Sequence, residues 1–210
     1  MGKKANGKET EIAVDGRKVL KLAKFHRIRP LLFEYDKKTS LLAIKNKEYL
    51  KIFVTQNALK NLKDIYHTKK LLQQFETAGI PAILHKGLQY QFEIYENPQL
   101  RERGDIDVLV QKKDVLPSMN VLKDQGFGSE ILNPDQPETE IGQHIEKLLS
   151  FNYLYQLPVN NKSLLLDFQW GVKSDFHSFH FPYPLIFHKA TLRDFYGIRV
   201  LQVDKESLFW

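Results

Sequence analysis

Two successive strand, turn and helix patterns between residues 80 and 126 restrict this 210-residue chain to folds that combine a sheet with helices. The first consists of the apolar run IPAIL (80–84), the turn residues His85-Lys86-Gly87 and a segment of helical spacing. The second consists of DIDVLV (105–110) and a helical segment that begins at Asp114 and ends at Gly126. Together these patterns predict an α+β fold.

The residues before this region are predicted to be helical. Between Leu41 and Thr77, apolar residues recur at intervals of three and four without a proline, which predicts a long helix ending at Ala78-Gly79. The segment from Val19 to Tyr35 has a helical rhythm that Pro30 interrupts, which predicts two short helices or one kinked helix. We therefore expect a disordered tail over residues 1–15, a helical region over 16–78 and a sheet-containing core over 79–210.

The second half of the chain is predicted to add more sheet. Phe127 to Leu132 is a candidate strand, and the segments 151–157 and 163–172, separated by Asn160-Asn161, predict an antiparallel hairpin. A helix over 185–196 and a strand over 198–203 are expected to follow. The final VDKESLFW begins like a capped helix and stops within about two turns, so we expect the core to be truncated at its C-terminus.

Composition narrows the possible chemistry. The chain has no cysteine, which excludes disulfides, thiolate zinc sites and a cysteine nucleophile. His177 and His180 have a spacing that could suit a metal, but no third ligand is apparent, so no zinc is expected. There is no signal peptide and no apolar run near the roughly 18 residues that span a bilayer, so we expect a cytoplasmic protein without membrane contact.

The charge of the chain is a weak indication of its partners. The net charge of +6 is compatible with polyanions such as nucleotides or RNA. Solubility is the plainer explanation, because many of the lysines are scattered over the first seventy residues without the interleaved aromatic residues of a single-strand binder.

Two acids, Asp105 and Asp107, occupy alternate positions of the predicted strand 105–110. Alternation directs both carboxylates to one face, while Ile106 and Val108 face the other. Like charges this close raise each other's pKa unless a cation lies between them, and Mg²⁺ or Mn²⁺ would meet that need. The alternative is that both acids are ordinary exposed residues at the start of a strand.

Two further features support a site for a metal-bound triphosphate. The turn His85-Lys86-Gly87 opens a helix, so it offers backbone N–H groups and a lysine charge to a phosphate. Asp167 lies between Leu166 and Phe168, where a shared metal would compensate its charge and its carboxylate could accept a proton from a hydroxyl. The alternatives are that Gly87 only permits the turn, that Lys86 is solvated and that Asp167 faces solvent.

The segment from Ile80 to Val110 resembles the signature of an uncharacterised nucleotidyltransferase family: Lys-Gly, a helix ending in Tyr, an Asp/Asn-Pro loop and Arg-x-x-Gly-Asp-Ile-Asp-x-Leu-Val. The matching residues are Lys86, Gly87, Tyr95, Pro98, Arg101, Gly104, Asp105, Asp107, Leu109 and Val110. The later segment from Asp167 to Trp170 resembles the family's second motif, with Gln169 in place of the usual histidine. The resemblance extends from about Val19 to Trp210.

This resemblance implies the polymerase-beta-like nucleotidyltransferase fold, with a mixed sheet flanked by helices and, in this chain, an N-terminal helical annex. It implies catalytic and metal-binding roles for Asp105, Asp107 and Asp167. Residues expected to bind the nucleotide are His85, Lys86, Gly87, Arg101 and Gly104. The broader superfamily commonly has Gly-Ser before its acidic pair, whereas this chain has Lys-Gly and a longer spacer.

The expected reaction is metal-dependent transfer of a nucleoside monophosphate from a nucleoside triphosphate such as ATP to a hydroxyl, with release of pyrophosphate. The acceptor is a small molecule, a protein or RNA. One alternative is a catalytically inactive nucleotide-binding module, which Gln169 favours. Another is a toxin-like transferase acting on tRNA, which the isoelectric point of about 9.3 suggests. Arg103 fits no part of the motif and is expected to be a surface charge.

Overall fold

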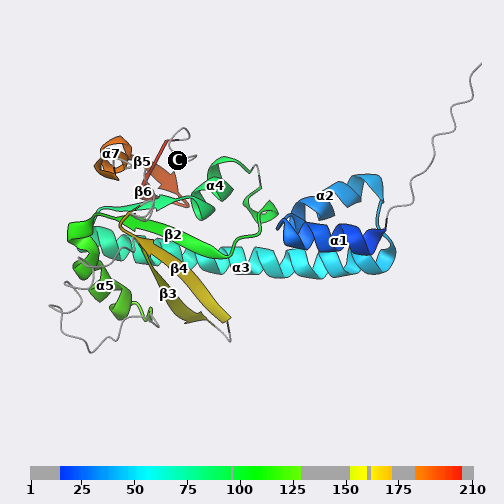
Figure 1. Ribbon diagram of the computed structural model, residues 1–210, viewed down its shortest axis with the longest axis horizontal. Helices are drawn as coiled ribbons and strands as arrows, with labels where there is room; N and C mark the ends of the chain where they lie inside the picture. Colours follow the sequence, from blue (N-terminus) through cyan, green and yellow to red (C-terminus); the bar gives the residue numbers. More distant parts are fainter. Residues whose placement is uncertain (1–14, 96, 129–151, 160–161, 172–182, 205–210) are drawn as a thin grey trace, which may run out of the picture. The chain divides into compact units, whose positions relative to one another are not determined.

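The computed structural model describes residues 15–95, 97–128, 152–159, 162–171 and 183–204 (Figure 1). The chain forms two compact units, which are described separately below. The helical unit comprises the described residues up to Asn57 together with Leu100–Glu102, and the sheet unit comprises those of Ala58–Gln99 and of Arg103–Trp210. None of the described helices has the length and apolar character needed to cross a membrane.

The helical unit contains α1 (Gly16–Phe25), α2 (Arg29–Thr39) and the first part of α3 (Ile44–Thr77) (Figure 1). Asp15 caps α1, because its carboxylate accepts the backbone N–H groups of Arg17 and Lys18. Arg27 has a φ of 55°, and this left-handed residue separates α1 from α2. Pro30 lies in the first turn of α2, where its missing N–H costs nothing, so two short helices form rather than one kinked helix.

A buried ion pair attaches residues 100–102 to this helical unit. The Arg29 guanidinium donates to both carboxylate oxygens of Glu102, with a shortest N–O distance of 2.6 Å, and the Arg29 backbone N–H donates to the same side chain. The guanidinium carbon also lies 3.4 Å from the ring centroid of Phe53. The Glu102 carboxylate thus has its charge paired by Arg29 and accepts hydrogen bonds from both the backbone and the side chain of that residue.

Six strands within the described residues form one mixed sheet in the order β3-β4-β2-β1-β6-β5. Their bounds are β1 Ala82–His85, β2 Asp105–Val110, β3 Asn152–Val159, β4 Lys162–Gln169, β5 Thr191–Phe195 and β6 Ile198–Gln202. Strand β2 is antiparallel to β1 and parallel to β4, whereas β1 is parallel to β6. The predicted α+β class and mixed sheet are therefore confirmed.

Alternation along the strands divides their apolar side chains between two cores. Ile106, Val108 and Val110 belong to the larger core, where the C-terminal half of α3 and α5 (Val115–Asp124) cover the sheet. Leu109 faces the other way and packs with Ile83 and Val203, near α7 (Tyr183–Lys189). The sheet unit therefore has helices on both faces of its central strands.

The predicted helix over 185–196 is wrong in its second half. Helix α7 ends at Lys189, and the following residues form β5, which pairs with β6 across a two-residue turn. The turn residues Tyr196 and Gly197 have φ values of 50° and 83°, a combination that suits tight hairpins and no helix. The turn chemistry therefore outweighed the helical spacing of the apolar residues.

Several other sequence predictions can be compared only in part. The hairpin is confirmed, since β3 and β4 pair antiparallel from Asn152–Gln169 to Val159–Lys162. In the candidate strand after Phe127, Gly128 forms an isolated bridge with Gln156. The predictions for residues 1–14, 129–132, Asn160-Asn161, His177, His180 and the C-terminal helix after Asp204 lie outside the described residues.

Candidate functional site

The register of the sheet brings three side chains of the predicted site into one row. Asp107 of β2 is paired with His85 of β1 on one side and with Asp167 of β4 on the other. Directly paired residues of neighbouring strands, about 4.8 Å apart, direct their side chains to the same face. Asp105 lies two positions before Asp107 in β2 and therefore faces the same side. These four residues, His85, Asp105, Asp107 and Asp167, are called the row of acids below, and all of them belong to the sheet unit.

The acids of this row are not ordinary exposed residues. Asp107 is only 7% exposed, and Asp105 and Asp167 are half-buried. Burial, together with the charges of Asp105 and Asp167, raises the pKa of Asp107 to about 6, although Lys86 and the Gly87 N–H act to lower it. The strand thus holds closely spaced negative charge that its surroundings offset only partly.

The turn before α4 (Gly87–Glu93) is built around Asp107. The Gly87 N–H donates to Asp107 Oδ2 at 3.1 Å, and a Cβ on Gly87 would lie 2.9 Å from the same oxygen. Only glycine permits this close approach without displacing the carboxylate. Because α4 has seven residues and its first N–H donates to Asp107, that N–H is already engaged, and the positive charge of the turn comes from Lys86.

Lys86 has a backbone conformation that normally requires glycine. Its φ is 47° and its ψ is −119°, which an L side chain adopts at a cost of about 1–3 kcal/mol. Strain of this kind persists only where the surrounding structure imposes it. Here the hydrogen bond from Gly87 to Asp107 and the bond from Tyr90 N to Lys86 O, at 2.7 Å, impose it.

We expect the Lys86→Gly variant to be more stable than the Lys86→Ala variant by about 1 kcal/mol, because glycine relieves the strain but gains freedom in the unfolded chain. Both variants lose the ammonium near Asp107, so comparing the two isolates the backbone effect. Urea unfolding at a fixed pH measures the difference. Equal stability of the two variants would show that the turn is not strained.

Gln169, two residues after Asp167 in β4, links the members of the row. Its Nε2 group donates to Asp167 Oδ2 at 2.5 Å and to Asp107 Oδ1 at 3.4 Å, and its Oε1 lies 3.0 Å from His85 Nε2. Burial, with Lys86 nearby, lowers the pKa of His85 to about 3, although the bond to Gln169 raises it. His85 is therefore neutral at physiological pH, and it contacts Gln169 rather than an open surface.

Arg103 is buried, so its predicted role as a surface charge is wrong. Its guanidinium donates to Asp64 Oδ2 and to Gln91 Oε1, each at 2.6 Å, and its side chain is 1% exposed. The Arg103 Cδ atom lies 3.3 Å from the place that a Gly87 Cβ would occupy, so this ion pair packs against the turn next to Asp107.

Sequence reasoning missed Asp64 and Gln91 as partners of this region. A signal was present in α3, where buried polar residues recur at intervals of four, three and four: Asn57, Asn61, Asp64 and Thr68. Polar residues along the buried face of a helix require partners, so this pattern in α3 indicated that polar or charged residues from other segments would contact the helix.

Two residues of the predicted nucleotide site are not part of the row. Arg101 belongs to the helical unit, where its backbone oxygen accepts the Asn57 side-chain amide at 3.2 Å. Gly104 is exposed and directly precedes β2. The nucleotide-binding roles of Arg101 and Gly104 remain predictions from the sequence.

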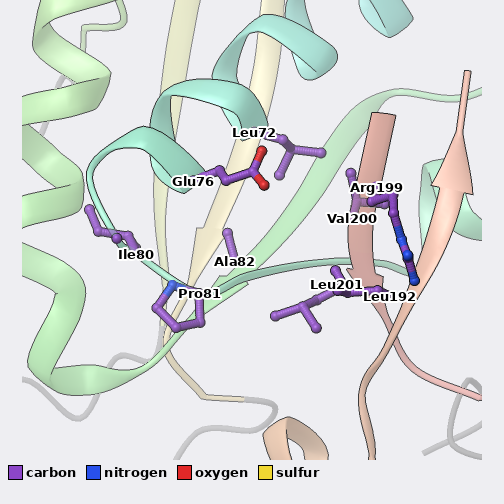
Figure 2. Close-up of a pocket in the computed structure, with 10 residues that line it drawn as sticks. Leu72, Glu76, Ile80, Pro81, Ala82, Leu192, Arg199, Val200 and Leu201 are labelled. Atoms are coloured by element: carbon purple, nitrogen blue, oxygen red, sulfur yellow. The ribbon is translucent and has the colours of Figure 1, made fainter. Parts of the chain in front are cut away.

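An apolar pocket of about 310 Å³ lies elsewhere on the sheet unit (Figure 2). It is formed by the end of α3, the residues leading into β1 and the β5–β6 hairpin, with Glu76 and Arg199 as its charged lining residues. Because Ala82 lines it and His85 is at the other end of β1, this pocket is separate from the row of acids.

Comparisons with known proteins give one family and one similar structure. The model of a family described as "Uncharacterised nucleotidyltransferase" matches residues 13–210. A solved structure of a "putative nucleotidyltransferase" from Thermotoga maritima is similar with a TM-score of 0.45 and 8% sequence identity, covering 68% of this chain and 78% of that chain. No curated protein matches the chain.

Proposed function

The chain belongs to the uncharacterised nucleotidyltransferase family, and on this premise we propose that it transfers a nucleoside monophosphate from a nucleoside triphosphate to a hydroxyl acceptor. The observation that carries the proposal is the position of Asp107, buried on the sheet, paired with Asp167 and two residues from Asp105. Closely spaced carboxylates whose charge is offset only partly are suited to bind a divalent cation, and that cation can at the same time bind the phosphates of a nucleotide.

The donor set fits Mg²⁺ or Mn²⁺. In the described part of the chain, no group of three or more His, Cys, Asp or Glu residues is placed so that it could hold a metal ion. Mg²⁺ does not require such a group, since it usually takes one or two carboxylates and completes its octahedron with water and phosphate oxygens. Bound by Asp105 and Asp107, with Asp167 as a further ligand, the cation would neutralise charge on the triphosphate and on the leaving pyrophosphate.

The side chains of the row have separate tasks in this proposal. Asp107 is oriented by the Gly87 N–H, and the Lys86 ammonium binds phosphate oxygens as a point charge. Asp167 accepts the proton of the attacking hydroxyl. The hydroxyl oxygen then forms a bond to the α-phosphorus while the bond from that phosphorus to the bridging oxygen breaks, and pyrophosphate leaves.

Calorimetry tests the binding half of this proposal. The wild-type protein, titrated with each nucleoside triphosphate in the presence of Mg²⁺, is expected to bind at least one of them. The double variant Asp105→Asn, Asp107→Asn is expected to lose that binding, because it removes both carboxylate charges. Asp124→Asn, at an exposed position in α5, is the matched control and should bind as the wild type does. A wild type that binds no triphosphate with Mg²⁺ contradicts the proposal.

Labelling of an acceptor tests the transfer half. Incubation of the protein with an α-labelled triphosphate and cell extract should place label on an acceptor in the wild type and not in the double variant. Triphosphate binding without any labelling would identify an inactive binding module. Ribonuclease treatment separates the acceptor classes, because its removal of the label would identify RNA as the acceptor.

A further inference from the structure

Gln169 makes more contacts in the row of acids than a glutamine needs for burial alone. It is 1% exposed, and its amide reaches Asp107, Asp167 and His85, which come from three different strands. Gln202, in β6 of the same sheet, is equally buried, yet its Nε2 has no partner among the described residues. Burial in this sheet therefore does not by itself produce a network like that of Gln169.

The orientation of the Gln169 amide follows from the charges around it. Two carboxylate oxygens lie on one side, and carboxylates accept hydrogen bonds but cannot donate them. The NH₂ group must face these acids, so the carbonyl oxygen faces His85 and requires a hydrogen on His85 Nε2. The reverse orientation would direct the carbonyl oxygen at two negative groups.

We propose that Gln169 is a positioning residue: its single NH₂ group holds Asp107 and Asp167 convergent for the metal-bound triphosphate, and His85 fixes the orientation of its amide. The proposal rests on the function proposed above. Without a shared donor, two neighbouring carboxylates repel each other and rotate apart whenever no cation is bound. Holding them together in advance lowers the cost of assembling the metal site.

A neutral donor suits this task better than a cationic one. An arginine or lysine would also bridge the two acids, but its charge would oppose the approach of a divalent cation. The amide leaves the negative charge in place while it restrains the geometry. Outer residues that orient metal ligands in this way typically change metal affinity by about 10–100-fold when they are replaced.

Binding of Mn²⁺ to the nucleotide-free protein, followed by electron paramagnetic resonance, tests the positioning role without any need for turnover. Gln169→Met keeps the size of the side chain but removes its donors, and we expect the dissociation constant for Mn²⁺ to rise about 10-fold or more. Gln202→Met makes the same change at a second buried glutamine of the sheet, in β6, and is expected to leave Mn²⁺ binding unaltered. Circular dichroism verifies that each variant is folded.

A double-mutant cycle establishes whether Gln169 acts through Asp167. Asp167→Asn is expected to weaken Mn²⁺ binding by itself, and adding Gln169→Met to it should then have little further effect. Unaltered Mn²⁺ binding in Gln169→Met, or an equal loss in the presence and absence of Asp167→Asn, overturns the positioning role. If the wild type itself does not bind Mn²⁺, the proposed function fails, which is a distinguishable result.

The tautomer of His85 gives a second measurement that involves no metal. Nitrogen-15 spectra of the metal-free wild type are expected to show a neutral His85 with its hydrogen on Nε2, assigned by comparison with His85→Gln. A hydrogen on Nδ1 would mean that the amide of Gln169 is reversed and directs its oxygen at the acids. That result would overturn the proposal even if the metal affinities followed the expected pattern.

Discussion

Replacing Asp107 by asparagine is expected to stabilise the metal-free protein at pH 8 by up to about 3 kcal/mol while removing metal-dependent binding of the triphosphate. The folded protein must keep a charge on a carboxyl group that is 7% exposed and lies near Asp105 and Asp167. Asparagine has nearly the same shape and carries no charge. The gain has an upper limit because the asparagine NH₂ group faces either Gly87 N–H or Gln169, both of which are donors.

The pH dependence of this effect identifies its cause. The pKa of Asp107 is about 6 in the folded protein, above its ordinary value of 3.8, so the folded state binds the proton more tightly than the unfolded state does. The stability that Asp107 contributes is therefore fully present below about pH 3.8 and is lost as the pH rises through about 6. The difference in the free energy of unfolding between wild type and Asp107→Asn should increase over this pH range and stay constant at higher pH.

Urea unfolding at several pH values in the presence of a chelator measures this difference. Excess Mg²⁺ at pH 8 should then stabilise the wild type and leave Asp107→Asn unchanged, because the cation binds the folded site only. Asp124→Asn, at an exposed position, is the control and should alter the free energy of unfolding by less than about 0.5 kcal/mol. A gain in Asp107→Asn that is the same at pH 4 and pH 8 would mean that the charge of Asp107 is not its cause.

Replacing Arg103 by methionine is expected to reduce the free energy of unfolding by about 3 kcal/mol. The substitution leaves the Asp64 carboxylate buried without its closest cation, and it also removes the hydrogen bond to Gln91. Lys60, which is 2.7 Å from Asp64 Oδ2 but partly exposed, compensates only part of the loss. Because the Arg103 side chain also packs against Gly87, the variant should weaken triphosphate binding as well.

A second substitution separates a broken ion pair from a lost packing contact. Adding Asp64→Leu to Arg103→Met removes the uncompensated charge, and replacing a buried ion pair by apolar residues is often neutral, so much of the stability should return. Arg199→Met removes an exposed arginine and should change the free energy of unfolding by less than about 0.5 kcal/mol. A loss below about 1 kcal/mol in Arg103→Met would contradict the structural role of the pair.

The fold was predictable wherever local patterns agree with tertiary packing. The helix over 41–77 and the hairpin of β3 and β4 were both predicted from spacing and turn residues, and both are present. The structure of residues 190–196 was not predicted correctly, because apolar spacing over so short a segment suits a helix or a strand, and the Tyr196-Gly197 turn decides between them. Local spacing alone does not resolve that choice.

For the candidate site, the sequence indicated the acids and the turn His85-Lys86-Gly87 but not the contacts among them. Asp105, Asp107 and Asp167 were recognisable because each is an acid within an apolar strand pattern. Nothing in the local sequence indicated that Arg103 pairs with Asp64, since 39 residues separate them and the pair forms only when α3 packs against the segment before β2. The expectation that Arg103 is a surface charge rested on its absence from the motif, and it was wrong because the partner lies far away in the sequence.

The amino-acid sequence by itself determined which residues share a face of each strand, because strand alternation acts between neighbouring residues. Only the tertiary structure decided that Asp107 is buried and that Gln169 reaches two acids. Both depend on the register of β4 against β2, and a slip of one residue would turn Asp167 and Gln169 to the opposite face. Register is a property of strands that come from distant parts of the chain, so the contacts of Gln169 with Asp107 and Asp167 could be found only in the folded protein.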